Sequence, residues 1–332
     1  MPQPANPSPK PPVEALLRRF QSQRPLRGGS LLITIFGDAI APRGGAVTLG
    51  SLIDLAQPFG LAERLVRTAV ARLAAEGWVA ATRHGRRSEY RITESGRKRF
   101  AEATRRIYGA NPSSWDGQWT LAVLPPAGGR GNSRGASARA AGAAGKRRSV
   151  REELRWLGFG QLSPGVYAHP ACTVEDARGW LITVGGASPC WILKSATEGL
   201  AADRRLAAEG WDLAQIARRY RRFRDSFAPV AAAVREADAL APQAAFLVRT
   251  LLVHEYRKIH LQDPLLPPPL LPAQWVGTEA YELTARLYAT VFATAERFLS
   301  ESGRTIAGPL PPAGAEVHAR FGGKHADAGR SQ

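Results

Sequence analysis

Residues 57–77 pair a tight turn with an amphipathic segment, and this pairing constrains the fold more than any other feature of the sequence. Residues 57–60 read Gln-Pro-Phe-Gly, which predicts a turn because proline removes a backbone donor and glycine permits a positive φ. The segment from Leu61 to Glu76 then predicts a helix, ended by Gly77. Its apolar face consists of Leu65, Val66, Ala69, Val70 and Leu73. The opposite face carries Arg64, Arg67, Thr68 and Ala71, with Arg72 on the rim.

Further capped segments surround this helix. Ser30 predicts the N-cap of a helix over Leu31–Ile40, and Thr48 predicts the N-cap of a second helix. Two strands, Trp78–Arg83 and Ser88–Thr93, enclose a polar turn, and a helix over Glu94–Tyr108 follows. The order helix, helix, turn, helix, hairpin, helix is typical of a winged helix. We therefore expect residues 24–112 to form a winged helix-turn-helix domain.

The charge distribution indicates what this domain binds. Residues 1–112 hold 18 Lys and Arg against 8 Asp and Glu, although the whole chain has a net charge of +17. A basic surface favours a polyanion, because neutralised phosphates release counterions. A general preference for arginine is the alternative, since the chain has far more Arg than Lys.

Two groups of side chains are candidates for contacts with double-stranded DNA. On the predicted recognition helix, arginine can bond guanine in the major groove and threonine can touch a thymine methyl; the candidates are Arg64, Arg67, Thr68 and Arg72. Contacts with phosphate or a narrow minor groove position a protein without specifying sequence. The candidates for these, in and near the wing, are Arg43, Arg83, His84, Arg86, Arg87 and Ser88. The alternative for both groups is a solvated surface.

The rest of the chain predicts two further domains. In residues 113–195, strands at Trp119–Leu124, Leu162–His169, Trp180–Val184 and Cys190–Leu193, with a helix at Ser149–Leu157, indicate a ferredoxin-like α+β domain. Residues 127–145 are almost wholly Gly, Ala, Ser and Arg and predict a flexible insert. Residues 196–303 predict a helical domain. The fold class is thus multidomain α+β, and we expect residues 1–23 and 304–332 to be disordered.

Several classes of protein are disfavoured. Cys172 and Cys190 form no metal-ligand motif and fit a reducing cytoplasm. The first residues lack the apolar run of a signal peptide, and no stretch suits a membrane span. Asp116 precedes a strand where a nuclease metal ligand could stand, but a two-metal site needs several carboxylates. We expect a cytoplasmic, nucleoid-associated protein that is not an enzyme and has no cofactor; a metal-dependent nuclease is the alternative.

These segments resemble the PaaX family of phenylacetic acid degradation repressors. The N-terminal likeness lies in residues 34–38 (TIFGD), 42–45 (PRGG), 49–53 (LGSLI), 58–61 (PFGL), 63–64 (ER), 66–68 (VRT), 72–73 (RL), 76–78 (EGW) and 85–88 (GRRS), with Tyr90 and Thr93. Residues 156–160 (WLGFG) and 164–167 (PGVY) resemble the central domain of the family. Residues 252–258 (LVHEYRK), 263–264 (DP), 266–267 (LP) and 270–272 (LLP) resemble its C-terminal domain. The likeness covers residues 24–126 and 146–300.

The resemblance implies a homodimeric repressor of aromatic-acid catabolism, released by an aryl-acyl-CoA such as phenylacetyl-CoA. It also implies a central domain similar to a CRISPR adaptation nuclease. A regulator of another pathway with another effector is the alternative. Two features depart from the family: the longer insert, and Ala62, which stands where a polar N-cap is expected.

The effector candidates form two groups. Arginines at 218–224 could hold phosphates, and the family-like segments add basic and aromatic side chains. The candidates are Arg221, Arg222, His254, Arg257, Lys258 and Trp275, and we expect a pocket between the central and C-terminal domains. A solvated surface or non-specific DNA contact is the alternative for the arginine run.

Overall fold

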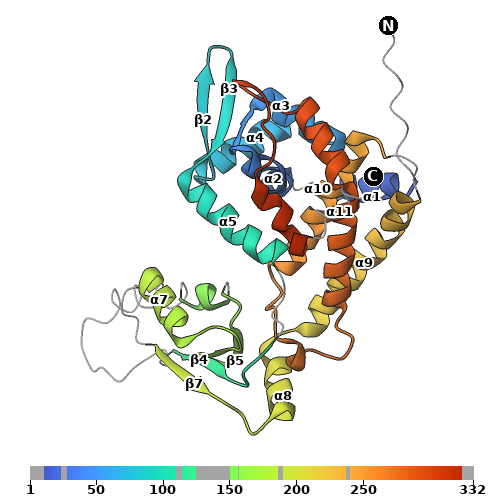
Figure 1. The fold of residues 1–332 in the computed structure, drawn as a ribbon. Helices are drawn as coiled ribbons and strands as arrows, with labels where there is room; N and C mark the ends of the chain where they lie inside the picture. Colours follow the sequence, from blue (N-terminus) through green and yellow to red (C-terminus); the bar gives the residue numbers. More distant parts are fainter. Residues whose placement is uncertain are drawn as a thin grey trace, which may run out of the picture. The chain divides into compact units, whose positions relative to one another are not determined.

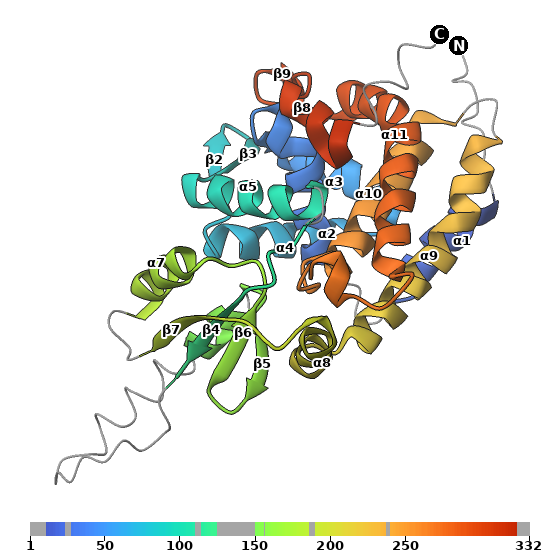
Figure 2. The same cartoon turned by 60° about the horizontal axis from the view of Figure 1, so that its bottom comes forward.

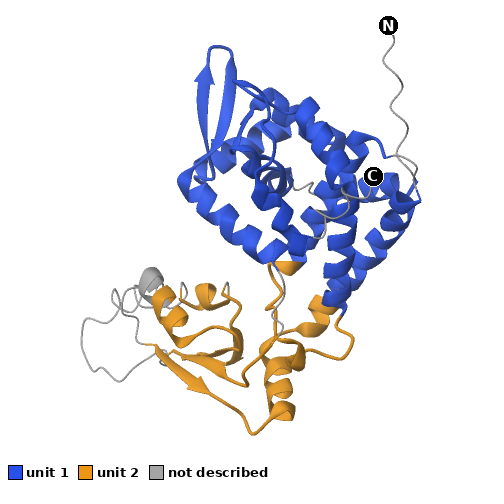
Figure 3. Ribbon diagram, in the orientation of Figure 1, with its two compact units in different colours: residues 1–110, 219–259, 276–332 blue, residues 111–218, 260–275 orange. Residues whose placement is uncertain are grey.

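A computed structural model describes residues 11–23, 28–109, 114–124, 150–155, 157–185, 190–236 and 240–323, without side chains for 181–185. The insert expected at 127–145 lies outside these residues. The chain forms two compact units (Figure 3). Unit 1 comprises residues 1–110, 219–259 and 276–332, and unit 2 comprises residues 111–218 and 260–275. The N-terminal block and most of the C-terminal helices therefore share one unit.

The N-terminal block of unit 1 follows the predicted order of elements, with one helix, α1, and one strand, β1, that the sequence did not predict. It consists of α1 (Pro11–Gln21), α2 (Gly28–Ile35), η1 (Phe36–Ile40), η2 (Ala41–Arg43), β1 (Ala46–Thr48), α3 (Leu49–Ala56), η3 (Gln57–Phe59), α4 (Glu63–Ala75), β2 (Val79–His84), β3 (Arg87–Ile92) and α5 (Glu94–Tyr108). Strands pair antiparallel in the order β1-β3-β2. The β2–β3 hairpin projects beyond the helices of its unit (Figure 1).

Local signals explain most of these boundaries. The hydroxyls of Thr48 and Thr93 accept bonds from the amides of Ser51 and Gly96, so both residues act as N-caps. Gly60 ends η3 with a φ of 80°, and Gly77, which follows α4, has a φ of 75°.

The first predicted helix differs from the structure. We expected Ser30 to cap a helix over Leu31–Ile40, but α2 begins at Gly28 and Ser30 lies inside it. The remaining residues, Phe36–Ile40, form a π-helical turn. Arg257 of the C-terminal block donates to both the carbonyl and the hydroxyl of Ser30, so Ser30 bonds a distant residue instead of capping.

Unit 2 is built on an antiparallel sheet with the strand order β5-β6-β4-β7. The strands are β4 (Trp119–Val123), β5 (Gly160–Ser163), β6 (Val166–His169) and β7 (Trp191–Ser195). Helical residues 150–155 follow β4 in the chain, and α7 (Val174–Gly185) connects β6 to β7. The helix α8 (Leu200–Gly210) packs against β5 and the 3-10 turn η4 (Pro268–Leu270).

The strand predicted over Trp180–Val184 is wrong, because these residues belong to α7. The cause lies at the start of that helix. The Thr173 hydroxyl accepts from the Asp176 amide at 3.0 Å and donates to the Asp176 carboxylate at 2.8 Å. This reciprocal cap starts a helix that overrides the strand preference of Ile182, Thr183 and Val184.

The C-terminal block is helical, as predicted, and its main helices are α9 (Leu213–Arg235), α10 (Pro242–His260) and α11 (Val276–Ser302). Figure 2 shows these three helices with α1 beside α9. The expected domain over 196–303 does not match the packing, since residues 196–218 and 260–275 belong to unit 2. None of the helices in the described ranges is long and apolar enough to cross a bilayer.

Both expected disordered ends contain folded segments. In the N-terminal region, α1 buries Val13, Leu16 and Phe20. After α11, β8 (Arg304–Thr305) pairs with β9 (Gly308–Pro309), and η5 (Ala315–Gly323) buries Phe321. These sparse apolar side chains find partners in unit 1, so the expectation of disorder is wrong for residues 11–23 and 304–323.

Candidate nucleic-acid interface

The helix α4 has one packed and one exposed face. Its buried side chains include Val66, Val70 and Leu73, and the helix packs on α2 and α3. The four predicted recognition residues are all exposed: Arg64, Arg67, Thr68 and Arg72. The predicted amphipathic division of this helix is therefore confirmed, while its start moves from Leu61 to Glu63.

Local bonds hold the exposed face in its present form. Arg67 pairs with Glu63 at 2.6 Å, and Arg72 pairs with Glu76 at 2.8 Å, each one helical turn apart. The Thr68 hydroxyl donates to the Arg64 carbonyl at 2.9 Å. Exposed pairs of this spacing contribute only about 0.3–0.5 kcal/mol. Because these pairs are weak, a base edge or a phosphate can replace the two carboxylates as partner at small cost.

The start of α4 lacks a side-chain cap. Ala62 adopts the extended conformation of an N-cap residue, but no side chain accepts from the first amides of the helix. Glu63 stands in the first turn, where its negative charge interacts favourably with the helix dipole. The sequence prediction of a weakly capped helix is confirmed.

The β2–β3 hairpin brings several cations to one tip. His84 pairs with Arg87 across a two-residue loop, Gly85-Arg86, in which Gly85 has φ of 59°. Five of the predicted wing residues lie here; Arg83, His84, Arg86 and Arg87 are exposed, and Ser88 is half-buried. The strand β2 begins only a few residues after α4, and the tip of the hairpin that it forms with β3 is rich in arginine.

Arg43 is different, and its predicted contact with phosphate is wrong. Its side chain is fully buried and bonds the Glu296 carboxylate of α11 and the Ala39 carbonyl. A guanidinium enclosed in this way cannot reach a DNA backbone without unfolding its surroundings. Arg43 instead joins the N-terminal block to the C-terminal helices.

A buried cluster centred on Asp38 continues this connection. The Asp38 carboxylate accepts from Arg249 at 2.8 Å, Arg320 at 2.8 Å, Tyr108 at 2.7 Å and Tyr288 at 3.1 Å. Burial alone would raise the pKa of Asp38, but the two guanidiniums and the hydroxyl bond outweigh it and lower the pKa. The carboxylate is therefore ionised and fixes four segments of the chain around residue 38.

Two of the predicted effector residues, His254 and Arg257, bind the N-terminal block. His254 Nδ1 lies 3.0 Å from the Thr34 hydroxyl, and Arg257 Nε donates to the same hydroxyl at 2.8 Å. Burial lowers the pKa of His254 well below its usual value, and Arg257 and Lys258 lower it further. These residues dock α10 onto α2.

The other predicted effector residues are dispersed. Arg222 and Lys258 line one cavity, whereas Arg221 is exposed outside that lining. Trp275 packs against the cluster of Trp119, Leu266 and Leu270 in unit 2. Within unit 1, two of the six candidates, Arg222 and Lys258, thus share one cavity, and Arg257 lines a smaller one.

Asp116, the possible nuclease ligand, lies in unit 2. One carboxylate oxygen accepts from the Gln118 amide at 3.0 Å, and the other lies 4.0 Å from Lys194 Nζ. Across the described ranges, no three His, Cys, Asp or Glu side chains gather as a metal site would require.

Similarity to known proteins covers nearly the whole chain. Residues 27–96 match the PaaX-like protein family, residues 143–207 match the PaaX protein central Cas2-like domain, and residues 211–301 match the PaaX-like protein C-terminal domain. The chain is 37% identical to the transcriptional repressor PaaX of Escherichia coli (strain K12) over 315 residues, which span 94% of this chain and 95% of that protein. The solved structure of uncharacterized protein Rv0674 from Mycobacterium tuberculosis is 24% identical, covers 75% of this chain and 88% of its own, and has a TM-score of 0.45. With three matched domains and this degree of identity, the chain belongs to the PaaX-like protein family.

Proposed function

We propose that this protein is a DNA-binding transcriptional repressor that reads its operator with a winged helix-turn-helix formed by residues 28–108. The single observation that carries this proposal is the packed and exposed division of α4, whose outward face presents Arg64, Arg67 and Thr68. In such a domain α4 enters the major groove and the β2–β3 hairpin contacts the backbone or minor groove. The relative from Escherichia coli, a transcriptional repressor by name, supports the same function.

Family membership supports a proposal for the regulated genes and for the effector. We propose that the protein represses genes of phenylacetate catabolism and that an aryl-acyl-CoA such as phenylacetyl-CoA releases it from DNA. Release requires that the ligand bind the state without DNA more tightly than the DNA-bound state. A cytoplasmic protein associated with the nucleoid fits this function, and a homodimer fits an operator with two half-sites.

The middle of the chain supports a ferredoxin-like assignment. Its elements follow the order strand, helix, strand, strand, helix, strand along the chain. All strand pairs of its sheet are antiparallel, and the last strand, β7, lies beside the first, β4. The family description of this segment as Cas2-like agrees with it. We propose a structural role for this domain, in line with the repressor name of the relative.

A mobility-shift assay tests the recognition helix. The probe is a duplex from upstream of the protein's own gene, and the variant is Arg67→Ala. We expect weaker specific binding and a smaller difference between the natural and base-substituted probes, because a bidentate arginine contributes about 1–3 kcal/mol of discrimination.

Arg286→Ala is the matched control. Arg286 is also exposed and also pairs with a glutamate four residues away, Glu282, at 3.4 Å. This variant removes the same kind of ion pair within one helix, but far along the chain from α4. We therefore expect the Arg286→Ala variant to bind the duplex as the natural protein does. Unchanged discrimination by Arg67→Ala would remove α4 from the proposal.

A further inference from the structure

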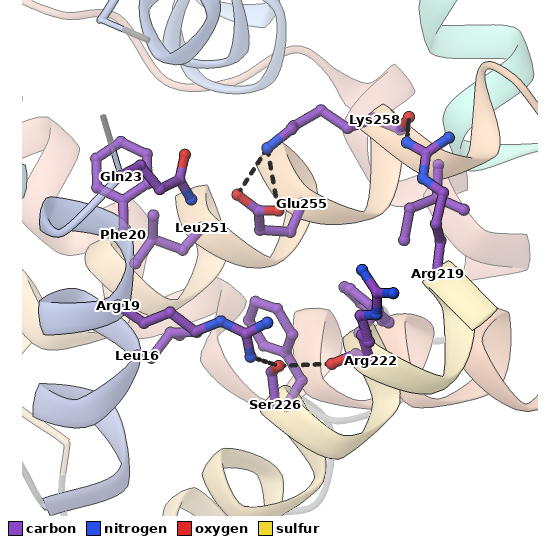
Figure 4. Close-up of a pocket in the computed structure, with 13 residues that line it drawn as sticks. Leu16, Arg19, Phe20, Gln23, Arg219, Arg222, Ser226, Leu251, Glu255 and Lys258 are labelled. Atoms are coloured by element: carbon purple, nitrogen blue, oxygen red, sulfur yellow. Dashed lines mark hydrogen bonds and ion pairs between the residues drawn. The ribbon is translucent and has the colours of Figure 1, made fainter. Parts of the chain in front are cut away.

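A cavity within unit 1 lies among α1, α9 and α10 (Figure 4). Its volume is about 240 Å³. Its apolar lining includes Phe20 of α1, Phe223 and Phe227 of α9, and Leu251 of α10, all of which are at most 4% exposed. The cavity therefore has a built apolar floor, to which α1 and two helices about 200 residues later in the chain contribute.

Cations surround this apolar floor. Arg19, Arg219, Arg222 and Lys258 line the cavity, together with a single carboxylate, Glu255. Lys258 pairs with that carboxylate at 3.1 Å, and Arg219 donates to the Lys258 carbonyl. Arg222 is exposed, and no carboxylate in the described parts of the chain pairs with its guanidinium. The lining thus has an excess of positive charge next to aromatic rings.

This lining selects the class of ligand. An apolar floor stabilises an uncharged organic group, and an unpaired guanidinium bonds an anion. With a volume of about 240 Å³, the cavity is large enough for a single aromatic ring with a short acyl chain. A nucleotide does not fit beside such a group, so any nucleotide part of a ligand would extend outward past the arginines.

The wall formed by α1 also reaches the turn before α4. The Phe20 ring lies 6.4 Å from that of Phe59 in η3, with the planes nearly perpendicular. A Cβ placed on Gly60 would approach Gln21 Nε2 to 2.9 Å, so α1 packs closely on this turn. One helix therefore contacts both the cavity and the turn that sets the position of α4.

We propose that the α1–α9–α10 cavity binds an amphipathic organic anion, with its ring-sized apolar group on Phe20 and Phe223 and its anionic part at Arg222, and that α1 transmits this binding to the turn before α4. The proposal rests on the repressor function, because it takes this ligand as the effector that releases the repressor from DNA. Two sources share the chemistry: a free aryl carboxylate and its coenzyme A thioester.

Calorimetric titration of the full-length protein without DNA tests the cavity. The probes are phenylacetyl-CoA, phenylacetate and coenzyme A alone, and the variants are Arg222→Ala and Ser226→Phe, the second of which places a ring in the cavity. We expect at least one of the two aryl probes to bind and each variant to weaken that binding about tenfold or more. Arg221→Ala is the matched control, since it removes the adjacent arginine that does not line the cavity, and we expect its affinity to stay within twofold.

The three probes give distinct results. Tight binding of phenylacetate itself identifies the free acid as the source, and binding of the thioester alone identifies the coenzyme A form. Equal affinity for coenzyme A and phenylacetyl-CoA would overturn the proposal, because the apolar floor would then contribute nothing. Lack of binding by every probe, or full affinity in both cavity variants, would also overturn it.

Phe59→Leu tests the transmission through α1. Phe59 does not line the cavity, so we expect unchanged ligand affinity without DNA but a several-fold smaller effect of ligand on operator affinity. Linkage requires that bound operator reduce ligand affinity by the same factor by which ligand reduces operator affinity. An undiminished ligand effect in Phe59→Leu would exclude this route. If the natural protein did not bind its operator, the repressor function would be refuted. The titration without DNA would still test the cavity, because it does not depend on operator binding.

Discussion

The Asp38 carboxylate lies 2.8 Å from Nε of Arg249, and both side chains are almost completely buried. Asp38 belongs to the π-helical turn after α2, whereas Arg249 belongs to α10. Arg249 also pairs with Glu296 of α11, which in turn pairs with Arg43. A continuous network of charges, buried except for the half-buried Glu296, therefore joins the block that carries α4 to α10 and α11.

Replacement of Asp38 should destabilise this unit strongly. Asp38→Ala leaves two buried guanidiniums without their common partner, which typically costs about 3–5 kcal/mol. Urea unfolding followed by circular dichroism measures the loss, with exposed Asp54→Ala as the control, expected within about 0.5 kcal/mol of the natural protein. Equal stability of the two variants would show that the cluster does not hold the blocks together.

The C-terminal tail should contribute to the same unit. Arg320 donates to the Asp38 carboxylate and the Tyr288 hydroxyl, each at 2.8 Å, and its guanidinium lies 4.3 Å from the Tyr108 ring centre. Truncation after Gly314 removes this cation and buried Phe321, so we expect a loss of several kcal/mol in the free energy of unfolding. Truncation after Gly323 keeps both and serves as the control. A similar stability for both truncated chains would contradict a structural role for the tail.

The N-terminal block could be predicted from sequence because its signals are local. Caps at Thr48 and Thr93 and glycines at positions 60 and 77 mark the ends of elements within a few residues of the elements themselves. The predicted helix over Glu94–Tyr108 agrees with α5 at both ends. The apolar stripe of α4 likewise depends only on helical spacing.

The residues that join the blocks could not be predicted in the same way. Asp38 and Arg249 are 211 positions apart, and Asp38 and Arg320 are 282 apart. No local pattern distinguishes a buried arginine such as Arg43 from an exposed one such as Arg86. The order of the tail could not be predicted for the same reason, since its few apolar residues become buried only against partners elsewhere in the chain.

Acid should destabilise the protein through His254. Burial lowers the pKa of His254 well below its usual value, so the folded state keeps the ring neutral. In the unfolded chain this histidine takes up a proton below about pH 6.5, whereas in the folded chain it does not. The free energy of unfolding therefore falls as the pH decreases below that value, by about 1.4 kcal/mol per pH unit. Urea unfolding between pH 7.5 and 5.5 should show a shallower slope for His254→Gln than for the natural protein. An unaltered slope in His254→Gln would contradict the prediction.

A polar N-cap should stabilise α4. Ala62 already has the extended backbone of a cap, with φ of −62° and ψ of 146°, but offers no acceptor. Ala62→Ser supplies one and should raise the free energy of unfolding by about 1 kcal/mol. Ala71→Ser makes the same chemical change at an exposed position inside the helix and should instead cost about 0.5 kcal/mol. Destabilisation by both variants would show that the first amides of α4 are satisfied in another way.

The wing should contribute salt-dependent affinity with little effect on sequence preference. Arg86 and Arg87 are exposed at the hairpin tip, where they can neutralise phosphates. Removal of one phosphate-neutralising arginine should reduce the slope of log affinity against log salt concentration by about 0.9, so Arg86→Ala combined with Arg87→Ala should reduce it by about 2. Fluorescence anisotropy over a salt series measures this slope on natural and base-substituted operators, and the ratio of the two affinities should change little. Arg67→Ala in the same series should lower that ratio, because its predicted partner is a base. If the wing variant instead lowered the ratio and kept the slope, the hairpin would be reading bases and the roles of hairpin and helix would have to be exchanged.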